Sequence, residues 1–187
     1  MTRAELEHAI RAACEVAQDQ EVYVFGSQAI LGRYPDAPKA LRQSVEADIS
    51  PVTAVDMVDI IDANLGELSS FHRAFGYYVH GVPISAAVLP SGWQRRAIAV
   101  RNANTNDATG WCVEAHDLAV SKLVAYREKD RDFVRTLLVE GLVNPRKLML
   151  RVDQLSDERV SDELRDRIRG WIQGTLKDLG PASKGKQ

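Results

Sequence analysis

The stretch that decides the fold reads VYVFGSQAI over residues 22–30 and, after a loop, SVEADIS over residues 44–50. Its first apolar run predicts a strand that ends at Gly26-Ser27, where a short helix begins. The second run predicts another strand. With the elements that follow, this order predicts an α+β fold: a small mixed β-sheet with flanking helices and a helical C-terminal subdomain.

Two carboxylates, Glu46 and Asp48, lie on the second predicted strand. Because side chains alternate between the faces of a strand, residues two apart point the same way. Two oxygen ligands on a rigid strand suit a Mg²⁺ (or Mn²⁺) ion that also holds phosphate oxygens. Gly26-Ser27, at the start of a helix, offers free backbone N–H groups to an anion. The pattern therefore predicts a site for a metal-bound nucleoside triphosphate.

The composition is that of an ordinary globular protein, with 187 residues of which 45% are hydrophobic and 27% charged. No run approaches about eighteen uninterrupted apolar residues, so we expect no membrane-spanning helix. The first residues, MTRAELEHAI, include acids and no apolar segment, so we expect no signal peptide. Cys14 and Cys112 lack metal spacing, and we expect reduced thiols in a cytoplasmic protein.

Charge is distributed unevenly along the chain, whose net charge is −2. Residues 1–115 contain 9 Lys/Arg and 14 Asp/Glu, whereas residues 116–187 contain 15 and 12. We therefore expect a core domain over residues 1–115, a helical subdomain over 116–180 and a disordered tail over 181–187. An acidic metal-binding half facing a basic half would suit a triphosphate or a nucleic-acid end, although mixed charges also merely solvate helices.

Periodicity and capping residues predict the remaining elements. Helices are expected at 3–18 with Thr2 as its cap, at 54–70, at 117–139 as one helix or two, from Asn144-Pro145 onward, and at 161–179. Strands are expected at 77–80, 84–89, 96–101 and 111–113, the last of them at a sheet edge.

Two further sets of residues are weighed as sites and set aside. Asp56, Asp59 and Asp62 recur at three-residue spacing, which describes a solvated helix face as well as a metal site, and we favour the solvated face. The histidines at 72, 80 and 116 have no ligand spacing, and they are expected to be surface or core residues.

The helix predicted from Asp117 carries charged residues beside its apolar face. At about 100° per residue, Lys122, Lys129 and Asp130 fall on or beside the stripe that contains Phe133. On a straight helix, Lys122 and Asp130 would be about 12 Å apart, too far to satisfy each other. Either they serve a site, with the lysine on phosphate oxygens and the aspartate on a metal or hydroxyl, or each reaches solvent or a residue of the first half.

These motifs resemble those of a known family. FGSQAI followed by EADIS resembles the glycine-serine and acid-x-Asp signature of the polymerase-β-like nucleotidyltransferases. The later DLAVSKLVAYREKDRDFVRTLL is similar to the C-terminal motif of their small AbiEii-related branch, which includes toxins of toxin–antitoxin pairs and many uncharacterised bacterial proteins. The resemblance covers roughly residues 20–140, and it rests on these positions: Gly26, Ser27, Glu46, Asp48, Lys122 and Asp130.

The resemblance implies an enzyme that moves a nucleoside monophosphate from a nucleoside triphosphate to an acceptor hydroxyl, on an RNA 3′ end such as that of tRNA or on a protein. Glu46 and Asp48 would hold Mg²⁺ (or Mn²⁺), and Gly26-Ser27 would cradle the β- and γ-phosphates. Lys122 would stabilise charge on the leaving pyrophosphate, with Lys129 as a further candidate for nucleotide binding. A cognate antitoxin is an additional implied partner, and no membrane partner is expected.

Two departures from the family pattern leave a second interpretation open. Glu46 stands where the usual signature has Asp, and the strand expected at residues 84–88 lacks the third carboxylate that many relatives carry, so Asp130 would have to substitute. The chain could instead be a degenerate nucleotide-binding or protein-interaction module without turnover. A nucleic-acid-binding protein is a weaker alternative, because no recognition-helix motif or aromatic stacking platform is evident.

Overall fold

A computed structural model describes residues 1–180, so the tail expected at 181–187 lies outside the described residues. The chain divides into two compact units. The first unit comprises Met1–Ala87 and Gln94–Glu114, and the second comprises Val88–Trp93 and the chain from Ala115 onward. Each unit is therefore described separately.

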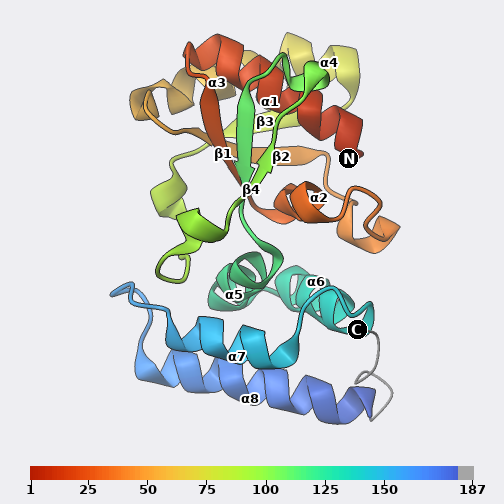
Figure 1. Cartoon of the computed structure of the whole chain (residues 1–187), viewed down its shortest axis with the longest axis vertical. Coiled ribbons are helices and arrows are strands. Elements are labelled where there is room, and N and C mark those ends of the chain that lie inside the picture. Colours follow the sequence, from red (N-terminus) through yellow and green to blue (C-terminus); the bar gives the residue numbers. More distant parts are fainter. Residues whose placement is uncertain (181–187) are drawn as a thin grey trace. The chain divides into compact units, whose positions relative to one another are not determined.

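The first unit is built on a five-stranded mixed sheet in the order β3-β2-β1-β5-β4 (Figure 1). β1 pairs antiparallel with β2 and parallel with β5, while β2 pairs parallel with β3 and β4 pairs antiparallel with β5. The strands are β1 Glu21–Phe25, β2 Glu46–Pro51, β3 Tyr78–Gly81, β4 Ile98–Val100 and β5 Thr109–Cys112. The observed architecture confirms the predicted α+β class with a small mixed sheet.

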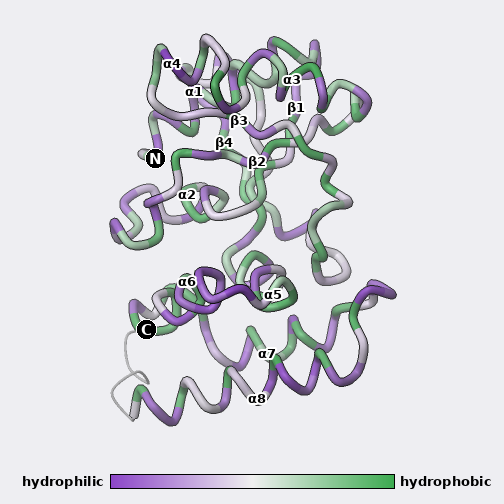
Figure 2. Tube along the Cα trace, turned by 180° about the vertical axis from the view of Figure 1, so that it is seen from behind, coloured by the Kyte–Doolittle hydropathy of each residue, from purple (hydrophilic) through white to green (hydrophobic). Residues whose placement is uncertain are grey.

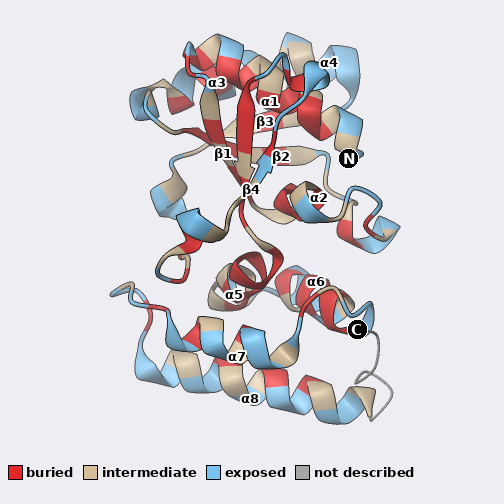
Figure 3. Ribbon diagram, viewed as in Figure 1, coloured by how far each residue is buried: buried red, intermediate tan, exposed pale blue. Residues whose placement is uncertain are grey.

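Helices cover one face of this sheet. They are α1 Arg3–Ala17, α2 Ile30–Arg33, α3 Val58–Leu65 and α4 Ser70–Phe75. Along the strands, Val24, Ile49 and Val79 are fully buried, and the residue before each of them keeps some exposure; β2 becomes buried on both faces at its end (Figure 3). A Cβ at Gly110 would lie 2.4 Å from Ile10 Cδ1, so α1 packs directly on β5. The polar residues of β2 and β3 consequently lie on the opposite face.

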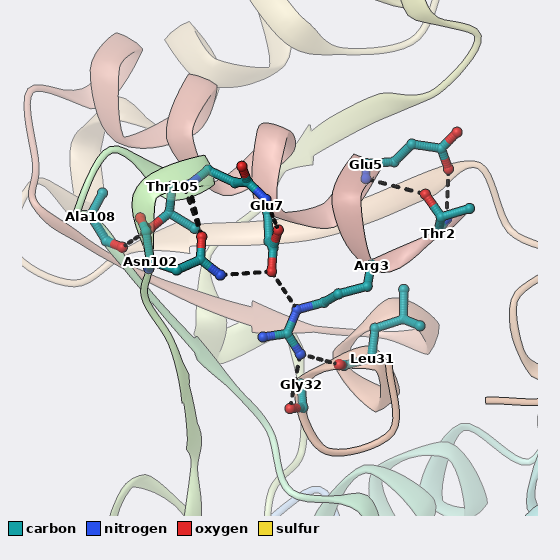
Figure 4. A network of polar contacts seen from close by, with 10 residues as sticks. Thr2, Arg3, Glu5, Glu7, Leu31, Gly32, Asn102, Thr105 and Ala108 are labelled. Atoms are coloured by element: carbon teal, nitrogen blue, oxygen red, sulfur yellow. Dashed lines mark hydrogen bonds and ion pairs between the residues drawn. The ribbon is translucent and has the colours of Figure 1, made fainter. Parts of the chain in front are cut away.

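A polar network fastens the start of α1 to two loops (Figure 4). Thr2 and Glu5 form a capping box, as predicted. The buried carboxylate of Glu7 accepts hydrogen bonds from Arg3 at 2.9 Å and from Asn102 at 2.9 Å. The Arg3 guanidinium also donates to the Leu31 carbonyl at 2.6 Å. These charge-assisted bonds hold the 3-10 turn at residues 103–105 and the end of α2 against α1.

The second unit is helical, with α5 Ala115–Ala125, α6 Glu128–Val139, α7 Pro145–Asp153 and α8 Asp162–Leu179. Hydrophobic and hydrophilic residues alternate along α8 (Figure 2), and its buried positions include Ile168 and Ile172. Asn144 and Ser161 cap α7 and α8 through their side chains. The helix start at Asn144-Pro145 is as predicted, and the helix expected from residue 161 begins one residue later, at Asp162. Over residues 1–180, none of the helices has the length and apolarity that crossing a membrane requires.

Several predicted boundaries are wrong. Instead of a strand at 84–89, the chain forms a 3-10 turn at Ile84–Ala86, where the Ile84 amide donates to Ser50 Oγ at 3.2 Å. The strand expected at the edge near residue 111 is β5, which lies between β1 and β4. The helix expected to reach residue 70 ends at Leu65, because Gly66 caps it and Leu68 adopts a left-handed φ of 64°.

Candidate functional site

Glu46 and Asp48 lie side by side on the sheet face that α1 does not cover. They alternate along β2 with Ala47 and Ile49, which are fully buried on the other face. The side chain of Glu46 is 35% exposed and that of Asp48 is 24% exposed. The two-residue spacing thus places two carboxylates together at a partly accessible surface of the first unit.

The neighbouring strand β3 supplies two more polar groups to this cluster. In the parallel register, Tyr78 pairs with Glu46 and His80 pairs with Asp48. The Tyr78 hydroxyl donates to Glu46 Oε2 at 3.2 Å. His80 Nδ1 lies 3.0 Å from Asp48 Oδ1 and 3.1 Å from Glu46 Oε1. Because both strands alternate with the same period, all four side chains meet on one face.

The cluster shifts the pKa values of its members. Burial, together with the nearby charge of Glu46, raises the pKa of Asp48 to about 6. Burial and the same carboxylate raise the pKa of Tyr78 to about 12. For His80, burial acts to lower the pKa, but the hydrogen bond to Asp48 and the surrounding carboxylates raise it overall. Crowded negative charge of this kind favours a bound cation.

Gly26 allows the backbone to approach the Asp48 carboxylate closely. Phe25 pairs with Asp48 across the antiparallel β1–β2 ladder, so Gly26 follows directly beside it. A Cβ on Gly26 would lie 1.8 Å from Asp48 Oδ2, and Gly26 has a left-handed φ of 68°. Only glycine meets both requirements. The close contact with Asp48 therefore explains why the Gly-Ser motif requires a glycine at position 26.

Ser27 is partly buried and opens a 3-10 turn, Ser27–Ala29, that runs into the single turn of α2. The adjacent Gln28 is fully buried and donates its amide to the Ser44 carbonyl at 3.0 Å, which ties the turn to the chain entering β2. The predicted short helix is present, but it begins as a 3-10 turn. Binding of phosphates by Gly26 and Ser27 stays a prediction.

Lys122 and Asp130 lie in the second unit and contact each other. Lys122 Nζ is 3.3 Å from Asp130 Oδ1, and Arg127 Nε is 2.6 Å from Asp130 Oδ2. The prediction that Lys122 and Asp130 are too far apart to pair is wrong, because the chain breaks between α5 and α6 at Tyr126, whose φ is 55°. Asp130 is 1% exposed and Lys122 is 11% exposed, so both point inward as predicted.

The immediate surroundings of Asp130 weaken it as a base. Although burial acts to raise its pKa, the hydrogen bond from Arg127 and the charge of Lys122 lower it overall. Lys129, which was predicted to lie on or beside the apolar stripe, is exposed at the start of α6. The roles of Lys122, Lys129 and Asp130 in binding phosphate, nucleotide or metal stay predictions.

His80, which was set aside for its lack of ligand spacing, belongs to this cluster. The strand next to β2 is β3, and not the segment at 84–88 that was expected to be the counterpart of a relative's acidic strand. At the position beside Asp48, β3 carries His80. A signal was available: the predicted strand at 77–80 places Tyr78 and His80 two residues apart, as Glu46 and Asp48 are. Asp56, Asp59 and Asp62 are exposed, as predicted.

The donor set fits a divalent cation. One ligand atom from each of Glu46, Asp48 and His80 lies within 4.8 Å of the others. An octahedral ion with bonds of about 2.1 Å holds neighbouring donor atoms about 3.0 Å apart, which matches the two histidine–carboxylate distances. These residues could hold a metal with small side-chain movements. Cys14 and Cys112 are free and buried, and neither belongs to this cluster.

Comparison with known proteins supports the chemistry that the cluster indicates. Over residues 4–169, the chain matches the family described as nucleotidyltransferase of unknown function (DUF6036). Searches of curated proteins and of solved structures returned no match. The match spans most of the chain and includes every candidate site residue, from Gly26 to Asp130. The chain therefore belongs to this family of nucleotidyltransferases.

Proposed function

We propose that the protein transfers a nucleoside monophosphate from a nucleoside triphosphate to an acceptor hydroxyl, with a divalent cation held by Glu46 and Asp48. One observation carries the proposal: in a member of a nucleotidyltransferase family, two carboxylates share one strand face beside a glycine that contacts one of them. The cation, when bound, would neutralise triphosphate oxygens and favour attack at the α-phosphorus.

The chain's own residues position the reactants. Glu46 and Asp48 would hold the cation that neutralises the triphosphate, and the bare backbone at Gly26 leaves room for the Asp48 carboxylate to lie where the cation needs it. Tyr78 holds Glu46 in place through its hydroxyl. The acceptor oxygen forms a bond to the α-phosphorus as the bond to pyrophosphate breaks, and the hydroxyl proton passes to solvent water. This is catalysis by positioning and electrostatics.

The finer details come from the resemblance to the AbiEii-related branch. In this proposal the acceptor is an RNA 3′ end, such as that of tRNA, or a protein, and the enzyme acts as the toxin of a toxin–antitoxin pair. Lys122 and Lys129 would serve the nucleotide, as the motif in the second unit implies.

A second candidate is a nucleotide-binding module without turnover. The observation that favours it is that the residue paired with Asp48 on β3 is His80, which is not a carboxylate. Asp130, with its lowered pKa, is a weak substitute for a third carboxylate as a base. In this candidate, the carboxylate cluster would still bind a metal-bound nucleotide.

Incubation with each α-³²P-labelled nucleoside triphosphate, Mn²⁺ or Mg²⁺ and total tRNA tests the proposal. Label should pass to RNA or to protein, and the transfer should be lost in the double variant Glu46→Gln/Asp48→Asn. The matched control is Asp56→Asn/Asp59→Asn, which removes two exposed acids of the same unit and should keep full transfer.

Two other results have distinct meanings. Metal-dependent binding of nucleotide by calorimetry, without transfer to any acceptor supplied, would favour the binding module. If the folded protein neither transfers label nor binds nucleotide, both candidates are wrong, and the family fold serves another purpose in this chain.

A further inference from the structure

His80 occupies a position that serves both carboxylates at once. Its Nδ1 atom lies 3.0 Å from Asp48 Oδ1 and 3.1 Å from Glu46 Oε1. The register of β2 and β3 sets this arrangement, because it pairs His80 directly with Asp48. The imidazole is 43% exposed, so an ion and its water ligands could reach it from solvent.

A nitrogen donor changes which cations the cluster favours. Mg²⁺ prefers oxygen ligands only and gives up its water reluctantly. Imidazole instead suits transition-metal ions, whose affinity for mixed nitrogen and oxygen sites rises along the first row from Mn²⁺. A site with two carboxylates and one imidazole therefore discriminates against Mg²⁺, whereas a site with three carboxylates does not.

We infer that His80 Nδ1 is a third metal ligand, and that the site consequently prefers a transition-metal ion such as Mn²⁺ to Mg²⁺. The inference deepens the proposed function and rests on it for the purpose of the metal. The competing role for His80 is to donate a hydrogen bond to the two carboxylates without touching the ion.

Pulsed electron paramagnetic resonance of Mn²⁺ bound to the protein, without nucleotide, separates these roles. Direct ligation by an imidazole produces nitrogen modulation of the electron spin echo. The modulation should be present in the wild type and absent in His80→Asp, which offers an oxygen at the same place. The control is His72→Ala, since His72 lies beside the Tyr78 ring and accepts a hydrogen bond from the Leu68 amide at 3.0 Å; it should keep the modulation.

Calorimetry with Mn²⁺ alone and Mg²⁺ alone gives a second readout. The wild type should bind Mn²⁺ more tightly than Mg²⁺. In His80→Asp, the ratio of the two affinities should fall by about 10-fold or more, comparable with the effect of losing a supporting group at a metal site. The inference would be overturned if the wild type failed to bind Mn²⁺ or bound it without nitrogen modulation. It would also be overturned if His80→Asp kept the wild-type preference for Mn²⁺ over Mg²⁺.

Failure of this inference can be told apart from failure of the proposed function. The spectroscopic and calorimetric measurements use no nucleotide and no turnover. Nitrogen modulation in a protein that transfers no label would leave the histidine ligand established and remove only the transferase proposal. Label transfer without nitrogen modulation would support the transferase proposal and remove His80 as a metal ligand.

Discussion

Lys122 Nζ and Asp130 Oδ1 lie 3.3 Å apart, although eight positions separate the two residues in the sequence. The contact forms because α5 ends at Ala125 and α6 begins at Glu128, so the chain changes direction between them. Lys122 also lies 4.8 Å from the centre of the Phe133 ring. An inward ammonium and an inward carboxylate are thus partners within the second unit, whatever further role the family motif gives them.

The pair should be energetically coupled. Lys122→Met and Asp130→Asn are each expected to lower the free energy of unfolding by about 1–3 kcal/mol, since each leaves a buried charged partner. The double variant should lose about 1 kcal/mol less than the sum of the two. Urea unfolding measures these values, and hydrogen exchange of amides in residues 115–139 assigns them to this unit. Strict additivity would mean that the contact contributes nothing.

Lys129→Met is the matched control for the lysine change. Lys129 is exposed and lies next to Asp130 in the sequence. Its substitution should change stability by no more than about 0.5 kcal/mol. If Lys122→Met lowers the affinity for nucleotide but leaves the free energy of unfolding unchanged, the lysine acts on the ligand and not on the fold.

Gly26→Ala should weaken metal binding. The added methyl group would overlap the Asp48 carboxylate at a φ that disfavours alanine, so either the turn or Asp48 must move. Calorimetry with Mn²⁺ is expected to show at least about a 10-fold loss of affinity. Gly76→Ala is the control, because Gly76 has a φ of 75° but nothing within 4 Å of an added Cβ. It should share the backbone strain and keep the affinity, and equal losses in both variants would refute the steric account.

Asp48→Asn should stabilise the metal-free protein at pH 8. The pKa of Asp48 is raised from 3.8 to about 6 in the folded state. Between these two pH values, the native state therefore holds a proton that the unfolded state has already released. Stability therefore falls as pH rises from about 4 to about 6, and the penalty persists above that range. At about 1.4 kcal/mol per pKa unit, the variant should gain about 1–3 kcal/mol.

The pH dependence is the decisive part of that measurement. Urea unfolding in the presence of a chelator should show the gain at pH 8 and little difference below about pH 4, where both states are protonated. A difference that does not vary with pH would show that the substitution acts through packing instead of charge.

Tyr78→Phe should weaken metal binding without unfolding the protein. The lost hydroxyl leaves Glu46 Oε2 without its 3.2 Å hydrogen bond, and support of this kind is worth about 10- to 100-fold in affinity at metal sites. The preceding residue gives the control, since the Tyr77 hydroxyl bonds His8 Nδ1 at 2.5 Å. Tyr77→Phe should lower stability and leave Mn²⁺ affinity unchanged, and an equal effect on affinity in both variants would argue against a positioning role for Tyr78.

Local patterns in the sequence were sufficient to predict many of the helices and strands and the shared face of the two carboxylates. The two-residue period of a strand predicts that Glu46 and Asp48 share a face, and the cap Thr2 and the pair Asn144-Pro145 mark helix starts that the structure confirms. These features depend on geometry that repeats every two or about four residues, so a few neighbouring letters specify them.

The assembly of the cluster depends on pairing between distant segments. His80 meets Asp48 because β3 joins β2 in parallel, and Gly26 meets Asp48 because β1 joins β2 in the opposite sense. Lys122 meets Asp130 because the backbone turns at Tyr126, which a straight helical projection does not foresee. Strand order, register and helix breaks follow from packing of the whole chain, so no local window of residues contains them.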